Sequence, residues 1–173
     1  VQESVTILSK NRPETDWAFM VVLQTYLGFH THKPIDLNRL NRCREVFHRN
    51  HDTWKEAFVL EGLALSAADQ SDGSSVEANK DELKRRLACA KESLILRMNN
   101  GDSWGLAMSY TMLASIVKEQ GRLDDARKYL QKSLMLRRNF GEDLDGVIDC
   151  LLGLSRIEHS IGRLSAAVDH ARE

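Results

Sequence analysis

The sequence predicts an all-α protein, an α-solenoid built from stacked antiparallel helix pairs. The first observation is that small and apolar residues recur at helical spacing in two blocks, one on each side of Gly121-Arg122. The blocks comprise Ala107, Tyr110, Leu113, Ala114 and Val117, then Leu123, Ala126, Tyr129, Leu130 and Leu134. The second observation is that this pair repeats, because Gly162-Arg163-Leu164 follows Gly121-Arg122-Leu123 at a spacing of 41. One hairpin cannot bury its apolar face alone, so repetition predicts stacking.

The pair on either side of Gly121 is predicted to be two amphipathic helices joined by a tight turn. Gly121 suits a left-handed residue that closes the first helix, and Asp124 and Asp125 place negative charge on the first turn of the second. Ala114 and Ala126 are small, so the two backbones are expected to approach closely.

The same spacing of apolar residues predicts helices along most of the chain. Their expected ranges are 16–31, 36–49, 53–69, 77–99, 103–119, 123–139, 143–160 and 164–173. Aspartates stand where N-caps or first turns are expected, at Asp16, Asp36, Asp52, Asp102 and Asp143. The polar segment 71–75 is interpreted as a surface loop, with a recognition loop as the alternative.

Earlier copies of the pair are also visible. Trp54, Ala57, Leu60, Leu63 and Ala64 match the block that begins at Trp104 at a spacing of 50, and the block that begins at Trp17 follows the same order. Residues 91–94, KESL, return as residues 131–134, QKSL, forty positions later. Four first helices are therefore predicted.

These residues resemble tetratricopeptide repeats, in a long variety with a period near 40. The Gly, Leu, Ala signature is strongest at Gly121, Leu123 and Ala126 and returns at Gly162, Leu164 and Ala167. Upstream the sequence departs from the pattern, because Pro34 replaces the turn glycine and Arg86 replaces the small residue of the second helix. The resemblance implies a right-handed superhelix whose concave side is lined by the first helices.

The repeat pattern divides residues 1–173 as one repeat domain. The predicted parts are the end of a preceding repeat at 1–15, repeats at 16–51, 52–101 and 102–141, and a truncated last repeat at 142–173. The chain is therefore expected to be a fragment of a longer array.

Composition limits the classes of function. The chain has 173 residues, of which 42% are hydrophobic and 28% charged, and a formal net charge of −1. This balance gives no electrostatic reason to expect nucleic acid, and no segment approaches the roughly 18 apolar residues of a membrane span. Cys43, Cys89 and Cys150 lie far apart and are interpreted as buried thiols in a reducing compartment, so a cytoplasmic protein is expected.

No enzymatic chemistry is predicted, and neither a cofactor nor a metal is expected. The phosphate-binding GxxxxGK[ST] and nucleophile GxSxG motifs are absent from the sequence. His30, His32, His48 and His51 lie near one another in sequence but match no zinc spacing. The basic clusters at 84–86 and 137–138 are interpreted as solvated faces, and the three tryptophans as packing residues between repeats.

What remains is a surface for a partner. By resemblance to the repeat family, one row of positions on each first helix is expected to face the concave groove. These positions are Phe58, Glu61 and Leu65, then Met108, Thr111, Ser115 and Lys118, then Asp149, Leu152, Arg156 and His159, with Val21, Gln24, Gly28 and Ala68 as further members. The mixture of apolar and charged side chains suits an extended or helical peptide.

Two functions are compatible with this surface. The first is a protein-interaction scaffold, which binds a segment of another protein or of its parent chain and is also compatible with a homo-oligomer. The run from Leu136 to Gly141, followed by Gly146-Val147, resembles repeats of bacterial STAND-type ATPases and transcriptional activators, which implies a sensor or regulatory region. The alternative is a module that binds a small effector or signalling peptide, as in peptide-responsive regulators of Gram-positive bacteria.

Overall fold

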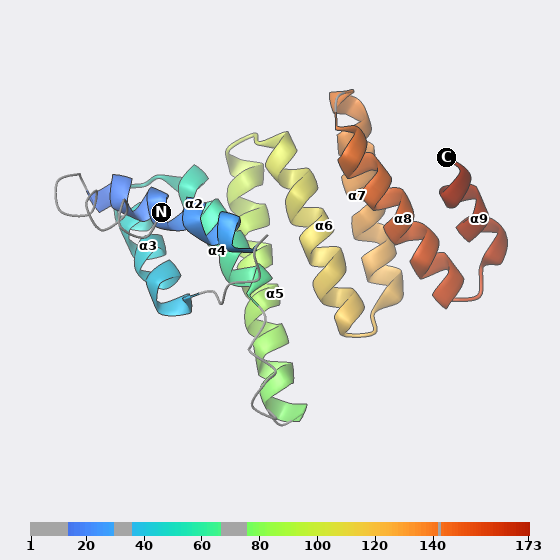
Figure 1. Ribbon diagram of the computed structural model, residues 1–173, viewed down its shortest axis with the longest axis horizontal. Coiled ribbons are helices and arrows are strands. Elements are labelled where there is room, and N and C mark those ends of the chain that lie inside the picture. The colour runs from blue at the N-terminus through green and yellow to red at the C-terminus, as the bar shows by residue number, and fades with distance from the viewer. Residues whose placement is uncertain (1–13, 30–35, 67–75, 142) are drawn as a thin grey trace. The chain divides into compact units, whose positions relative to one another are not determined.

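All regular secondary structure in the described residues is helical. A computed structural model describes residues 14–29, 36–66, 76–141 and 143–173. The helices, labelled in Figure 1, are α2 (Glu14–Phe29), α3 (Leu37–Arg49), α4 (Thr53–Leu65), α5 (Val76–Asn99), α6 (Ser103–Glu119), α7 (Leu123–Phe140), α8 (Leu144–Ser160) and α9 (Leu164–Arg172). The chain divides into two compact units between Leu96 and Arg97. The segments 1–13, 30–35 and 67–75 lie outside the described residues, and with them His30, His32, Pro34, Ala68 and the predicted loop at 71–75.

The predicted helix boundaries agree with the structure to within two residues except at the end of α4. That helix ends at Leu65 instead of residue 69, because Ser66 adopts an extended conformation with φ −64° and ψ 109°. The Ser66 hydroxyl donates a hydrogen bond of 2.7 Å to the Leu63 carbonyl and so caps the last turn.

The first unit has a core formed by α2, α3 and α4, which all contact one another. Its buried members are Ala18, Val21, Val22, Leu40, Cys43, Val46, Phe47, Val59 and Leu63. Helix α5 joins this unit through its polar side chains: the Ser93 hydroxyl donates to the Ala57 carbonyl at 3.1 Å, and the Arg86 guanidinium donates to the Ala64 carbonyl at 2.8 Å. Arg86 thus replaces the small residue of the other hairpins with a hydrogen bond to the facing helix.

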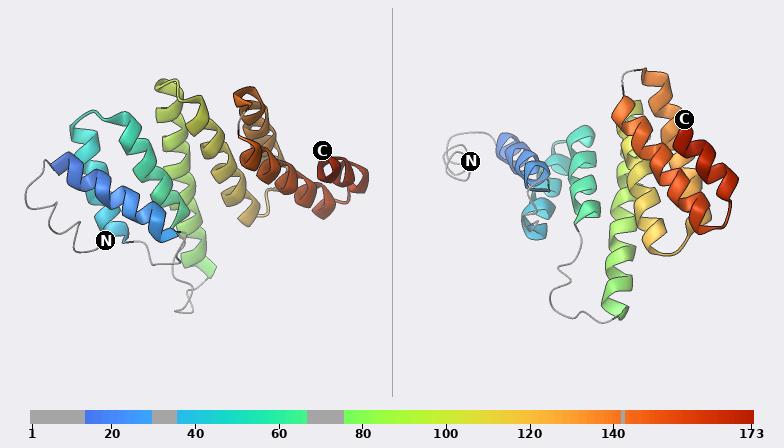
Figure 2. Two further views of the ribbon diagram at one scale, coloured as in Figure 1. Left: turned by 45° about the horizontal axis from the view of Figure 1, so that its top comes forward. Right: turned by 45° about the vertical axis from the view of Figure 1, so that its right-hand side comes forward.

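In the second unit, α6 to α9 follow one another as antiparallel neighbours, visible in Figure 1 and in both views of Figure 2. Ala114 and Ala126 are buried in the α6/α7 hairpin, where small residues are predicted. The next hairpin has a matching contact, because the Ser155 hydroxyl of α8 donates to the Ala167 carbonyl of α9 at 2.7 Å.

The turns and caps follow the sequence closely. Gly121 and Gly162 close α6 and α8 with φ of 76° and 81°, the left-handed region that glycine adopts without strain. The side chains of four predicted aspartates accept a hydrogen bond from the backbone N–H three residues later, at 2.8–3.1 Å. These N-caps are Asp36, Asp52, Asp102 and Asp143.

A buried arginine links α5 to α6, and a second one links α7 to α8. Arg97, in the last turn of α5, is 1% exposed and forms an ion pair with Asp102, the N-cap of α6. A methyl group on Gly105 would overlap the Arg97 side chain, so glycine is what makes room for it. Arg137, Asp143 and Gly146 repeat the same arrangement between α7 and α8.

At the junction between α3 and α4, the cation that pairs with the N-cap aspartate comes from the following helix, α4. Phe47 stands where the later repeats have arginine, and Lys55 stands where they have glycine. The Lys55 ammonium lies 2.5 Å from the Asp52 carboxylate and 5.7 Å from the centre of the Phe47 ring. The aspartate cap therefore has a cationic partner at all three junctions, although the helix that supplies the cation changes.

Candidate partner-binding surface

Glu61, Thr111 and Leu152 occupy equivalent positions of α4, α6 and α8. In α4 and α6 this side chain faces the second helix of its hairpin. Glu61 is fully buried and accepts a hydrogen bond of 3.3 Å from the Ser93 hydroxyl. The Thr111 hydroxyl lies 2.9 Å from that of Ser133. Leu152, at the equivalent position of α8, is 45% exposed. The prediction that Glu61 lines an open groove is therefore wrong.

Other candidates are partly covered. Phe58, Leu65 and Met108 have intermediate burial, and Phe58 packs edge-on against Trp54 with 4.6 Å between the ring centres. Val21 is 2% exposed and belongs to the core of the first unit, so it is corrected in the same way as Glu61. Phe58 also packs against that core.

The exposed candidates all lie on α6 and α8. They are Ser115, Lys118, Asp149, Leu152, Arg156 and His159, and we call them the α6/α8 surface. Arg156 and His159 also line a groove of about 630 Å³ between α8 and α9. On the α9 side, Leu164 and Val168 line this groove and are 60% and 45% exposed. The groove thus brings Arg156 and His159, two of the predicted site residues, together with apolar side chains of α9 that were not predicted as part of a site.

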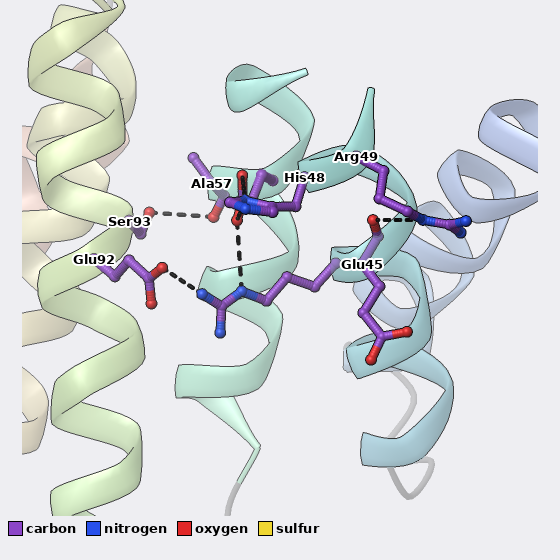
Figure 3. A network of polar contacts seen from close by, with 8 residues as sticks. Glu45, His48, Arg49, Ala57, Glu92 and Ser93 are labelled. Atoms are coloured by element: carbon purple, nitrogen blue, oxygen red, sulfur yellow. Dashed lines mark hydrogen bonds and ion pairs between the residues drawn. The ribbon is translucent and has the colours of Figure 1, made fainter. Parts of the chain in front are cut away.

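A polar network connects three helices of the first unit and is drawn in Figure 3. Glu56 of α4 is 3% exposed, and its carboxylate lies 3.5 Å from Arg44 Nε and 3.1 Å from His48 Nδ1. Arg44 continues the network by pairing with Glu92 of α5. Because Arg44 and His48 both contact the buried carboxylate, the network joins these helices and stabilises their packing.

The remaining histidines and metal ligands have simple surroundings. His48 contacts Glu56, and His51 adopts a left-handed conformation with φ 54° between α3 and α4. In the described part of the chain, no three His, Cys, Asp or Glu side chains gather in a way that could hold a metal ion. Over the same residues, no helix is both long and apolar enough to span a membrane.

Two interpretations of charged and aromatic residues need correction. Arg137 is 8% exposed and ion-paired, so the cluster at 137–138 is not a solvated face. Arg85 donates to the Ser66 hydroxyl at 3.0 Å and is half-buried. Trp54 and Trp104 are 45% and 49% exposed, so they are not buried between repeats as predicted.

Two of the three cysteines are buried, as predicted, and the third is partly buried. Cys43 and Cys150 are buried, Cys89 is half-buried, and all three are free. Burial raises the pKa of Cys43 from 9.0 to about 11, and it also raises the pKa of Cys89. Both thiols of the first unit are therefore protonated and poorly reactive at neutral pH.

Part of the chain matches a known family of proteins. Residues 105–173 match the tetratricopeptide repeat family model. No curated protein sequence matches the chain significantly.

Among the solved structures that match is one titled "Crystal Structure of the Apo Form of RapI". The match has a TM-score of 0.74 and 17% sequence identity and covers 96% of this chain. The chain spans 57% of the length of that protein, and at this identity the likeness establishes the fold alone. The fold is the predicted α-solenoid of helix pairs, and residues 105–173 of it match the tetratricopeptide repeat model.

Proposed function

We propose that the chain is a non-catalytic scaffold that binds a peptide or protein segment through the α6/α8 surface. The observation that carries this proposal is which cationic side chains of the second unit have an ion-pair partner and which do not. Arg122 and Arg137 are ion-paired, whereas within the described residues no ion pair or hydrogen bond engages the side chain of Lys118 or of Arg156. Unpaired, exposed cations beside Leu152 provide charge for orientation and apolar area for an anchor.

This chemistry favours a ligand with acidic side chains near an apolar one. Lys118 and His159 occupy equivalent positions of successive first helices, as do Ser115 and Arg156. A ligand carboxylate in this region meets a cation without first breaking an internal ion pair. Rim charges act mainly on the association rate and on specificity, so binding is expected to weaken as salt rises.

A display library of random peptides panned on the 173-residue chain tests the proposal. We expect the selected peptides to be rich in Asp and Glu and to lose at least about tenfold in affinity on a Lys118→Glu/Arg156→Glu variant, through loss of charge pairs. The control is Lys91→Glu/Lys128→Glu, which makes the same change in net charge on α5 and α7. Failure to select any peptide, or equal binding to the two variants, would contradict the proposal.

We also propose that the scaffold is the sensor or regulatory region of a larger bacterial signalling protein, as the run at 136–147 favours. A parent reading frame without a nucleotide-binding or DNA-binding domain would remove this support. The second candidate is an effector-binding module. It is favoured by the volume of the α8/α9 groove, which is within the 300–1,000 Å³ range of small-molecule sites. Melting temperatures that rise with a small effector but not with the selected peptides would favour this candidate.

A further inference from the structure

The arginines of α3 differ in what their side chains contact. Arg44 and Arg49 form ion pairs with glutamates of other helices. The side chains of Arg39 and Arg42 take part in no ion pair or hydrogen bond within the residues that the structure describes. Both lie instead beside one aromatic ring, that of Trp17 in α2. This part of the first unit therefore presents two cations to which no carboxylate of the described residues is bound.

Trp17 brings these two cations near each other. The Cζ atoms of Arg42 and Arg39 lie 5.3 Å and 5.9 Å from the centre of the Trp17 ring, which is within the range of cation–π attraction. The two arginines are three residues apart on α3, so their side chains leave the same face of that helix. Trp17 itself packs against the core of the first unit, which fixes its position. One anchored ring thus holds two guanidinium groups.

The carboxylates nearest in sequence do not neutralise this pair. Asp36 is engaged as the N-cap of α3, where its side chain accepts a hydrogen bond of 3.0 Å from the backbone N–H of Arg39. Asp16 and Glu45 are exposed, and neither forms an ion pair with these arginines. Arg42 is exposed and Arg39 is half-buried, so an anion from solvent can reach both without unfolding the helices.

We propose that Arg39 and Arg42 bind the phosphate monoester of a phosphorylated serine, threonine or tyrosine on a partner protein. This group carries about −1.5 to −2 charges at pH 7 and three acceptor oxygens, which matches two cations. Each guanidinium has a planar fork of N–H donors that suits phosphate oxygens. A carboxylate has one charge and two oxygens, which a single arginine satisfies, and a phosphodiester also has one charge. The pair therefore favours a phosphorylated protein over an acidic peptide or a nucleic acid.

The experiment uses a fluorescent peptide library with one fixed phosphoserine between random residues, and the same library with serine. Anisotropy titrations of the 173-residue chain are expected to show at least about tenfold tighter binding of the phosphorylated library, through charge-assisted hydrogen bonds. Arg42→Gln should remove most of this preference. Arg42→Lys should also reduce it, because lysine keeps the charge but lacks the fork.

The matched control is Arg49→Gln. It removes the same charge from the same helix, but from an arginine that is already paired with Glu14, so the preference should persist. Arg42 and Arg49 are both exposed, and circular dichroism is expected to show an intact fold in all three variants. Equal binding of the two libraries, equal losses in Arg42→Gln and Arg49→Gln, or full binding by Arg42→Lys would overturn the proposal.

Competition separates the possible sources of the phosphate. A phosphoserine peptide is expected to displace the bound library at lower concentration than inorganic phosphate or a single-stranded oligonucleotide. Either of these competing at least as well would overturn the assignment to a phosphorylated protein. The Lys118→Glu/Arg156→Glu variant should bind the phosphorylated library normally, because both substitutions lie in the second unit. A loss in that variant would assign the library to the α6/α8 surface instead, so the two proposals fail independently.

Discussion

Replacing Gly105 with alanine tests the packing of the buried arginine at the α5/α6 junction. Glycine to alanine inside a helix normally stabilises by about 1 kcal/mol. Here the added methyl group would lie closer than 3.0 Å to the Arg97 side chain, which is 1% exposed and has no free space to enter. Overpacking costs roughly 1–3 kcal/mol, and disruption of a buried ion pair costs roughly 3–5 kcal/mol. We expect a net loss of about 1–4 kcal/mol in the free energy of unfolding, because relaxation recovers part of these costs.

Urea denaturation followed by circular dichroism measures this loss. The control is Gly62→Ala, in a helix where the nearest side-chain atom would be 3.3 Å from the new Cβ, and its effect should stay within about 1 kcal/mol of zero. In an Arg97→Ala background, Gly105→Ala should cost at least about 1 kcal/mol less than in the unaltered chain. An unchanged or raised stability of Gly105→Ala, or additive effects in this cycle, would refute the reasoning.

Three further predictions concern titratable groups of the first unit. The Cys43 thiol should resist a thiol reagent near pH 8 until the chain unfolds, and rapid labelling of the folded chain would contradict this. Because burial raises the pKa of Cys43 from 9.0 to about 11, the protonated thiol stabilises the fold below pH 9.0, and this contribution is lost as pH rises to about 11. Glu56→Ala should lower the free energy of unfolding by about 1–3 kcal/mol by leaving Arg44 without its buried partner, and Glu56→Gln should cost less, as urea titrations can show. The hydrogen bond from Arg85 lowers the pKa of Glu82. The ionised Glu82 therefore stabilises the fold above its ordinary pKa of 4.5, and this contribution is lost as pH falls. A Glu82→Gln variant whose unfolding in acid is unchanged would disprove this role of Glu82.

The sequence is sufficient to predict the helix boundaries and most caps. The left-handed conformation of Gly121 follows from a glycine between two amphipathic blocks, and the aspartate caps follow from a short polar side chain before each block. Both are local effects, in which one residue decides the geometry of its own turn. For the same reason the end of α4 was missed, since the Ser66 hydroxyl competes with the backbone there.

Side-chain direction was harder to predict than helix position. Glu61 and Thr111 are polar, yet serines of the second helices turn them toward the interior of their hairpins. The burial of Arg97 and Arg137 was missed because charge alone predicts exposure. A signal was present in the sequence, since Ser-Leu-x-Leu-Arg occurs at 93–97 and again at 133–137 with a glycine following at Gly105 and Gly146. The apolar groove of α8/α9 depends on which helix faces go uncovered, which periodicity does not specify.

Amide hydrogen exchange of the chain with a library-selected peptide bound tests the assignment of the partner surface most directly. The account predicts slower exchange in α6 and α8, with α2 to α4 unchanged, because the exposed cations Lys118 and Arg156 lie on the former two helices. Protection confined to α2, α3 and α4 would contradict it.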